Sequence, residues 1–371
     1  MPKITNPSIP LNGLFAVVKP SGVTCMPMLD RIKSLLCESP LFVDPLPDKN
    51  VKQKRSKRKG GGPVKIGQGG TLDPLADGVL VIGIGKGTKS LGEFISSSKE
   101  YKTTGILGCE TDSYDSDGAR VRLAPWSHVT RGDVEKVLAQ FRGPIKQVPP
   151  IYSALKMDGK PLYEYAREGK PLPRPIVARD AHVFDLELID WREAQSEDNP
   201  TGHNYTWPTK ELSEEDRQRA EKVKSLLVQA EAQRPADQSA PTTAHLLAEA
   251  QPDPDVAAVE ALLTSTGNKK PPVFALKMTV SSGTYVRSIV HDIGLALGSA
   301  AHVVSLKRTK QGDFSLGDDE GNSGDCVPWH VFEKAFQDHE NGVAASPVEA
   351  RTDESLRADW EKEIFARWHE K

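Results

Sequence analysis

Hydrophobic positions in the 371-residue chain recur every two residues in some segments and about every 3.6 in others, which predicts mixed strands and helices. Apolar runs and apolar–polar alternation predict strands at 14–18, 79–84, 99–108, 184–188 and 274–280. Helical spacing and helix-end signals predict helices at 28–36, 88–94, 130–143, 161–169, 286–298, 328–336 and 356–368.

A polar stretch of roughly 80 residues separates the last two predicted strands and is rich in Glu, Gln, Ala, Pro and Ser. Ser213 to Asp216 can cap a helix, whereas 233–241 and 251–255 have the composition of disordered chain. We therefore interpret residues 191–270 as a polar, largely disordered insertion at the tip of a β-hairpin. It accounts for the low hydrophobic content of 37%.

The segment 65–85 carries the strongest candidate chemistry. Three glycines precede Asp73-Pro74, and the buried strand 79–84 follows. Proline restricts the residue before it to extended conformations, so the Asp73 carboxylate is expected to project from a stiff turn as a nucleophile or base. The alternative is structural: Asp73 caps a helix that has Pro74 as its first residue.

Several common cofactor and metal motifs fail in this chain. The phosphate-loop pattern breaks at Gly85-Lys86-Gly87, and the dinucleotide pattern that starts at Gly83 meets Thr88 where it needs glycine. The four cysteines lack zinc-site spacing, and the acidic turn 111–118 lacks the glutamate that completes a calcium loop. The sequence thus predicts no metal and no cofactor.

A basic run at 52–59, within the loop 50–62, leads into the Asp73 segment. It is interpreted as a phosphate-contacting loop, with a solvated loop and a nuclear-import signal as alternatives. Scattered cysteines and the lack of an apolar run of about 20 residues favour an intracellular protein with no membrane partner. The basic run favours the nucleus and no clear Arg-rich transit helix argues for mitochondria, so the expected location is the nucleus and/or mitochondrion.

Five separated segments carry motifs in a fixed order along the chain. They are Asn12-Gly13 with Lys19-Pro20-x-Gly22; Gly70-x-Leu-Asp73-Pro-x-Ala-x-Gly-Val-Leu80; Lys99-x-Tyr101 with Leu107 to Gly118; Pro149 to Gly169; and Gly283-Thr-Tyr285-x-Arg287 with Ala301 to Arg308. Together they resemble the TruB family of pseudouridine synthases. The resemblance leaves out the insertion, the basic loop and the tail.

This resemblance implies a mixed α/β fold with a largely antiparallel central sheet flanked by helices and an RNA-binding cleft. The catalytic domain would comprise residues 1–190 and 271–317, interrupted by the insertion 191–270. The tail 318–371 is predicted to be helical and too short for the extra RNA-binding PUA domain of many relatives.

The resemblance also implies a reaction: isomerisation of uridine to pseudouridine, with uridine 55 of the tRNA T-loop as the expected target and other RNAs left open. Asp73 would act on the ribose or base of a flipped uridine, and the opposite charge of Arg287 would keep it ionised. Tyr101 would stack on the base, which offsets part of the unstacking cost. A monomer is expected.

Further residues take substrate-binding roles by the same resemblance. Tyr285 would hold Tyr101 by a hydrogen bond, and Leu306 would close over the flipped base. Asp115 is a weaker candidate for a base contact. Lys19, in the opening motif, is a further candidate for substrate binding.

Two departures from the family pattern stand out. Gln68 replaces a histidine of the family, and its amide can still form hydrogen bonds to the substrate although a proton-transfer role becomes doubtful. Lys307 replaces an arginine. Two competing functions remain open: a non-catalytic RNA-binding or RNA-folding protein that keeps the cleft, and a protein-interaction scaffold built on the insertion.

Overall fold

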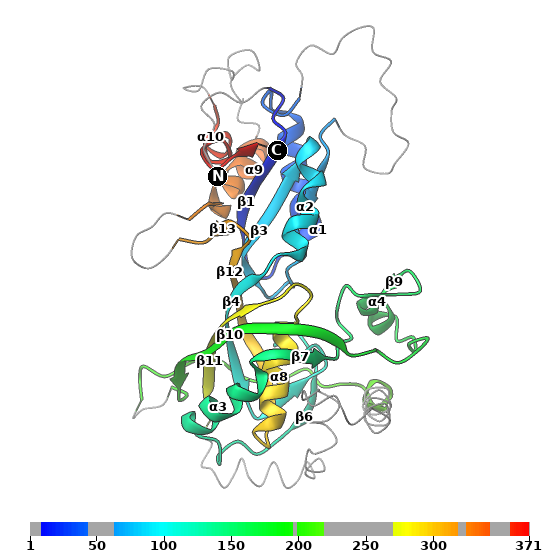
Figure 1. Cartoon of the computed structure of the whole chain (residues 1–371), viewed down its shortest axis with the longest axis vertical. Helices are drawn as coiled ribbons and strands as arrows, with labels where there is room; N and C mark the ends of the chain where they lie inside the picture. Colours follow the sequence, from blue (N-terminus) through cyan, green and yellow to red (C-terminus); the bar gives the residue numbers. More distant parts are fainter. Residues whose placement is uncertain are drawn as a thin grey trace. The chain divides into compact units, whose positions relative to one another are not determined.

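A computed structural model describes residues 9–43, 63–195, 199–218, 270–317, 324–341 and 357–370 (Figure 1). The basic run 52–59 and the stretches 233–241 and 251–255 lie outside these ranges. Among the helices that are described, none has both the length and the apolar character needed to cross a lipid bilayer. The chain divides into two compact units: Met1–Lys99 with Lys307–Lys371, and Glu100–Leu306. We describe each unit by itself.

The first unit is built on a sheet with the strand order β14–β1–β3–β12. Strands β1 (Gly13–Lys19) and β3 (Asp77–Ile84) pair antiparallel from Gly13↔Ile84 to Lys19↔Gly78, and β12 (Ala301–Gln311) joins β3 in parallel. Shorter strands extend these: β2 (Ile66–Gln68), β13 (Phe314–Ser315), β14 (Cys326–Val327) and β15 (His369–Glu370). Every residue of β3 after Asp77 is buried, as its continuous apolar run predicts.

The helices of the first unit are α1 (Cys25–Cys37), a 3₁₀ turn at Gly85–Lys89, α2 (Leu91–Ser96), α9 (Trp329–Glu340) and α10 (Asp359–Ala366). Figure 1 shows α1 and α2 on one side of β1 and β3, and α9 and α10 on the other. Two tail helices are present as predicted, although α10 ends at Ala366, so Trp368 lies beyond the helix rather than on its apolar face, and Leu356 lies outside the described residues. Trp360 and Trp368 fill the space beside Phe42.

The second unit has the strand order β12–β4–β11–β10–β7, where β4 (Lys99–Leu107) and β12 carry residues of both units. Strands β10 (Arg179–Arg192) and β11 (Val273–Val280) form a long antiparallel pair, and β7 (Gly143–Gln147) pairs antiparallel with β10. Two small hairpins complete the unit: β5 (Cys109–Thr111) with β6 (Arg120–Leu123), and β8 (Lys156–Met157) with β9 (Lys160–Pro161). The mixed α/β fold with largely antiparallel pairing is thus confirmed.

The second unit contains the helices α3 (Arg131–Val137), a 3₁₀ turn at Leu138–Phe141, α4 (Leu162–Arg167) and α8 (Val286–Ala296). The predicted capping box of α3 is present: Thr130 and Asp133 bond each other's backbone N–H. Helix α8 differs from its prediction, because all ten residues from Val286 to Leu295 are buried rather than one stripe. Its charged side chains therefore need partners inside the protein.

Several element ends move relative to the prediction. The helix expected at 88–94 is a 3₁₀ turn followed by α2, and Pro161 caps α4 rather than opening it. The strand β12, which carries the motif Ala301 to Arg308, has mixed polarity and was not predicted. Three of its polar side chains, those of His302, Arg308 and Gln311, are buried, so alternation gave no signal.

The segment between β10 and β11 joins the ends of an antiparallel pair, and its described part packs on the second unit. Trp207 Nε1 donates to the Leu107 carbonyl (2.9 Å), and His203 Nε2 lies 2.9 Å from the Pro271 carbonyl. Gly108 has φ +85°, and a Cβ there would meet both Trp126 and Trp207 at 2.6 Å, so the indole fits only beside glycine. Residues 199–211 form an anchored strap, and the predicted helix begins after Ser213.

We predict that Trp207→Ala lowers the free energy of unfolding by about 2 kcal/mol, because it removes packing and leaves the Leu107 carbonyl without its donor. The melting temperature should fall by about 4–8 °C in a differential scanning experiment. Trp207→Phe should lose less, since the ring remains, and the exposed neighbour variant Thr206→Ala should melt like the unmodified protein. Equal melting of Trp207→Ala and Thr206→Ala would contradict the anchoring role.

Candidate active site

The segment 71–76, here the carboxylate loop, carries Asp73 in the first unit. The Ala76 N–H donates to the Asp73 carbonyl (3.2 Å), which closes a turn over Pro74 and Leu75. β3 begins directly afterwards, at Asp77. Asp73 is half-buried and lies in a turn before a strand. The alternative that Asp73 caps a helix is therefore wrong.

Lys19 anchors this loop. Its side chain is 0% exposed, and Nζ donates to the carbonyls of Ala76 (2.6 Å), Pro20 (2.9 Å) and Pro74 (3.2 Å). These contacts use all three ammonium donors on main-chain oxygens. This geometry suits holding the loop better than reaching a substrate.

The residues that follow Lys19 complete the anchoring. Ser21 Oγ donates to the Leu75 carbonyl (2.6 Å), and the Gly22 N–H donates to the Pro74 carbonyl (2.8 Å). Cys25 Sγ lies 3.4 Å from both the carbonyl and the N–H of Leu72. Each carbonyl from Leu72 to Ala76 is thus hydrogen-bonded, so the backbone on both sides of Asp73 is fixed.

The charge of Lys19 is also constrained. Burial lowers the pKa of its ammonium, and the neighbouring carboxylates of Asp73 and Asp77 act in the opposite direction. Burial likewise raises the pKa of the Cys25 thiol, which keeps it a neutral donor. Arg308 is a second buried cation close by, and its Nε donates to the Val79 carbonyl (2.7 Å).

Gln68 lies at the end of β2, before the carboxylate loop. Its Nε2 donates to Thr71 Oγ1 (3.1 Å). The amide therefore contacts the first residue of the loop.

Arg287 forms the centre of a polar site in the second unit, together with Ser113, Asp115 and Tyr152. It is the second residue of α8 and 3% exposed. Nη1 donates to the Ser113 carbonyl (2.6 Å) and lies 3.3 Å from Asp115 Oδ2, and Nη2 donates to the Tyr152 carbonyl (2.9 Å). The guanidinium is aimed by fixed main-chain oxygens as well as by a carboxylate.

Asp115 is itself held on both oxygens. Oδ1 accepts from Ser113 Oγ (2.5 Å) and from the Asp117 N–H (3.1 Å), while Oδ2 faces Arg287. The side chain is buried. These contacts fit a residue that positions Arg287 better than one that touches a base.

Tyr285 is the N-cap residue of α8, so it leaves the turn just where the helix begins, as predicted. The Gln147 amide clamps it: the Tyr285 N–H donates to Oε1 (3.0 Å), and Nε2 donates to the Tyr285 carbonyl (3.2 Å). Since Tyr285 is extended and Arg287 helical, the two side chains need not follow helical spacing.

Tyr101 and Leu306 lie on the neighbouring strands β4 and β12 and are both buried. Thr103 Oγ1 donates to the Ser305 carbonyl (2.9 Å), which ties the two strands together beside these residues. The second unit thus holds an aromatic and an aliphatic side chain at the same end of one strand pair.

The structure groups the predicted residues into two sets. Lys19 and Gln68 lie with Asp73 in the first unit, and Asp115 lies with Arg287 in the second. The pairing of Asp73 with Arg287 joins residues of different units and stays a prediction. The sequence reasoning missed Ser21, Cys25 and Tyr152; Ser21 and Tyr152 stand inside motifs that had been singled out.

Family models match both halves of the chain. The model described as TruB family pseudouridylate synthase (N terminal domain) matches residues 56–207. A second, described as tRNA pseudouridylate synthase B C-terminal domain, matches residues 287–355. The first match contains the carboxylate loop and the second begins at Arg287.

Individual proteins are similar over most of the chain. tRNA pseudouridine synthase 4 of Schizosaccharomyces pombe is 37% identical over 372 aligned positions. The match covers 92% of this chain and 88% of that protein. tRNA pseudouridine synthase 4 of Saccharomyces cerevisiae is 37% identical, with 82% of this chain and 78% of that protein covered. tRNA pseudouridine synthase B of Bordetella avium is 31% identical, with 83% and 84% covered.

We predict that Lys19→Met frees the carboxylate loop, because methionine keeps the volume of the stem but supplies no donor to the Pro74 and Ala76 carbonyls. Peptides covering 71–77 should exchange amide hydrogen at least about tenfold faster, which corresponds to about 1.4 kcal/mol of local opening. Lys89→Met, at an exposed lysine of the same unit, serves as the control. Unchanged exchange in Lys19→Met would show that the loop does not depend on the ammonium.

Proposed function

This chain belongs to the TruB family of pseudouridylate synthases, and we propose that it is the isomerase that converts uridine 55 in the T-loop of tRNA to pseudouridine. The reaction breaks the C1′–N1 bond, turns the base over and joins C5 to C1′. The observation that carries the proposal is Asp73 on its anchored turn, in a chain 37% identical to a tRNA pseudouridine synthase over most of its length.

Asp73 is the catalytic carboxylate in this proposal. The loop contacts support the role because they restrict the backbone while Asp73 stays only partly buried. Holding a reacting group in its working geometry before substrate arrives lowers the entropic part of the barrier. Asp73 acts at C1′ or C6 of the uridine, and isomerisation consumes no external oxidant or reductant.

Arg287 supplies the opposite charge in the catalytic complex. A guanidinium within about 4–6 Å of a carboxylate favours its ionised form. The contacts of Arg287 with Ser113, Asp115 and Tyr152 support this role, since they fix the direction of the side chain from within the second unit. Asp115 is then a positioning residue for Arg287.

Tyr101 stacks on the flipped uridine, and Leu306 covers it from the neighbouring strand. Flipping costs a few kcal/mol, and stacking on an aromatic ring returns about 1–3 kcal/mol per base. Tyr285 holds Tyr101 by a hydrogen bond, and Gln68 contributes an amide to the substrate. Lys19 acts through the carboxylate loop.

The T-loop is the proposed target because RNA modification of this kind needs an unpaired, exposed base in a defined shape. Incubation with unmodified tRNA, followed by base-resolved chemical mapping, should give pseudouridine at position 55. A tRNA with cytidine at that position should give none. Product elsewhere only would leave the isomerase intact and overturn the T-loop assignment.

The non-catalytic RNA-binding function is disfavoured, because the chain keeps Asp73, Tyr101 and Arg287 in family motifs. We further propose a monomer that works inside the cell, in the nucleus and/or mitochondrion. Sedimentation with and without tRNA tests the first point, and imaging of the tagged full chain tests the second.

We predict that Asp73→Asn lowers the single-turnover rate at least 10⁴-fold, the order expected on losing an essential catalytic group. Binding of tRNA should stay within about threefold of the unmodified protein, since the change is isosteric. Asp30→Asn, at an exposed aspartate of α1 in the same unit, is the matched control and should keep the rate within about threefold. A normal single-turnover rate in Asp73→Asn would contradict the assignment of Asp73 as the catalytic carboxylate.

A further inference from the structure

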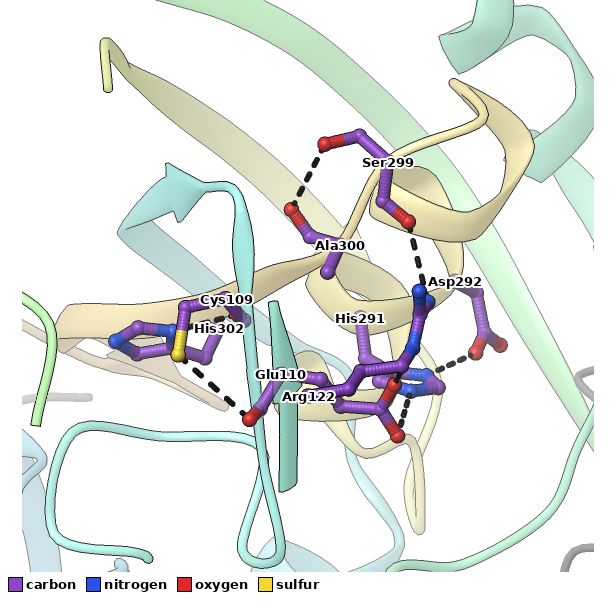
Figure 2. Close-up of polar contacts among 8 residues, drawn as sticks. All are labelled: Cys109, Glu110, Arg122, His291, Asp292, Ser299, Ala300 and His302. Atoms are coloured by element: carbon purple, nitrogen blue, oxygen red, sulfur yellow. Dashed lines mark hydrogen bonds and ion pairs between the residues drawn. The ribbon is translucent and has the colours of Figure 1, made fainter. Parts of the chain in front are cut away.

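A buried charged cluster lies one helical turn beyond Arg287 and is not used by the proposed chemistry. His291 is four residues after Arg287 on α8, so the two side chains leave the same face of the helix. His291 is 1% exposed. Figure 2 shows its ring between the carboxylates of Glu110 and Asp292: Nδ1 lies 2.9 Å from Asp292 Oδ1, and Nε2 lies 3.3 Å from Glu110 Oε1.

Glu110 is bound on its other side by a second cation. Arg122 Nε donates to Glu110 Oε2 (2.5 Å), and its Nη2 donates to the Ser299 carbonyl (3.2 Å). In the described part of the chain, the charged groups in contact with His291 and Glu110 are thus two carboxylates and one permanent cation, and protonation of His291 brings these four groups to neutrality. A buried net charge is costly, so the surroundings favour the imidazolium.

The titration of the two central groups agrees with this balance. Burial acts to lower the pKa of His291, but the charges of Glu110 and Asp292, together with the hydrogen bond to Asp292, outweigh it and raise the pKa to about 9. Burial acts to raise the pKa of the Glu110 carboxyl, yet His291 and Arg122 together hold it well below its usual range.

Tyr114 connects this cluster to Arg287. Its ring stacks on the His291 ring with centroids 3.9 Å apart and an interplanar angle of 21°, a geometry in which an imidazolium is attracted to the aromatic face. Tyr114 has φ +62°, a left-handed backbone that tyrosine rarely adopts, so the surrounding contacts must hold it there. Hydrogen bonds from the Val303 N–H to the Tyr114 carbonyl (3.0 Å) and from the Ser116 N–H to the Val303 carbonyl (2.9 Å) dock the turn on β12.

The residues on either side of Tyr114 are ligands of Arg287. Ser113 offers its carbonyl and Asp115 its carboxylate. A shift of the Tyr114 ring would therefore displace two of the partners that aim the guanidinium. In the described part of the chain, the titratable and charged groups facing His291 are Glu110 from β5, Tyr114 from the turn and Asp292 from α8, with Arg122 of β6 behind Glu110 and Arg287 near Tyr114.

We propose that His291, as an imidazolium held between Glu110 and Asp292, is a positioning residue that fixes the Ser113–Asp115 turn through Tyr114 and so aims Arg287. The proposal rests on the catalytic role of Arg287 proposed above. Because the pKa of His291 is raised in the folded protein, this support is complete below the unfolded value of about 6.5 and is lost as the pH rises through about 9.

The first test measures the ring itself, without any activity assay. In the full chain with ¹³C-labelled histidine, the His291 signal, assigned by its loss in His291→Gln, should titrate near pH 9. His302 is the internal control, and its Nδ1 lies 2.8 Å from the Cys109 carbonyl (Figure 2). Burial lowers the pKa of His302 to about 4, so its ring should stay neutral between pH 6 and 10. A neutral His291 at pH 7.5 would overturn the proposal.

The second test separates positioning from general stability. At pH 7.5, His291→Gln should lower kcat about tenfold and leave KM within about twofold, since the buried ring cannot touch RNA. The kcat of the unmodified enzyme should decline through about pH 9, and the variant should lack that decline. If His291→Gln has the same kcat and the same pH profile as the unmodified enzyme, the positioning role of His291 is refuted.

A third pair of variants decides the question if His291→Gln fails to fold. Tyr114→Phe keeps the stacked ring and should retain kcat within about twofold, whereas Tyr114→Leu should lose about tenfold at unchanged KM. Equal kcat in the two would refute the link through Tyr114. Failure of the proposed function would give a different result: Asp73→Asn would be fully active, or the unmodified enzyme would form no pseudouridine.

Discussion

The structure around the candidate catalytic residue depends on one buried ammonium. The ammonium of Lys19 is shielded from solvent and donates to three main-chain carbonyls, two of them in the carboxylate loop. A buried cation is tolerated only when its donors are satisfied and opposite charge is near, and Asp73 and Asp77 supply that charge. The cation that fixes the loop is thus stabilised by the carboxylate that the loop presents, so the two features depend on each other.

The close approach of strands extends this constraint. Gly78 has φ +104°, and a Cβ there would meet the Arg308 backbone at 2.2 Å, so only glycine lets β3 and β12 run together directly after the loop. The Arg308 side chain then bonds the Val79 carbonyl. The start of β3 is therefore held from β1 by Lys19 and from β12 by Arg308.

Much of the fold was accessible from the sequence, because the long apolar runs and the helix caps carry strong local signals. β1, β3, β4, β11 and the capping box at Thr130 appear where periodicity placed them. β12 was missed because its buried His302, Arg308 and Gln311 break the alternation. Asp73-Pro74 was ambiguous for a physical reason: the same dipeptide opens a helix or a turn, and the contacts with Lys19 and Gly22, more than fifty positions away in sequence, decide for the turn.

The sequence predicted the candidate site only where its contacts depend on the identity of a side chain. Lys19 and Arg287 both bind main-chain oxygens, and a carbonyl has the same chemistry whatever residue it belongs to. The residue types at Pro74, Ala76 and Tyr152 do not indicate that their carbonyls bind a cation. These partners of Lys19 and Arg287 could therefore not be predicted from composition or spacing. His291 and His302 make the same point about charge. Burial acts to lower the pKa of both histidines. The two carboxylates beside His291 outweigh it, whereas the single carbonyl beside His302 does not, so the two pKa values move in opposite directions. The fold, more than the identity of either residue, therefore determines which of the two histidines carries a proton at neutral pH.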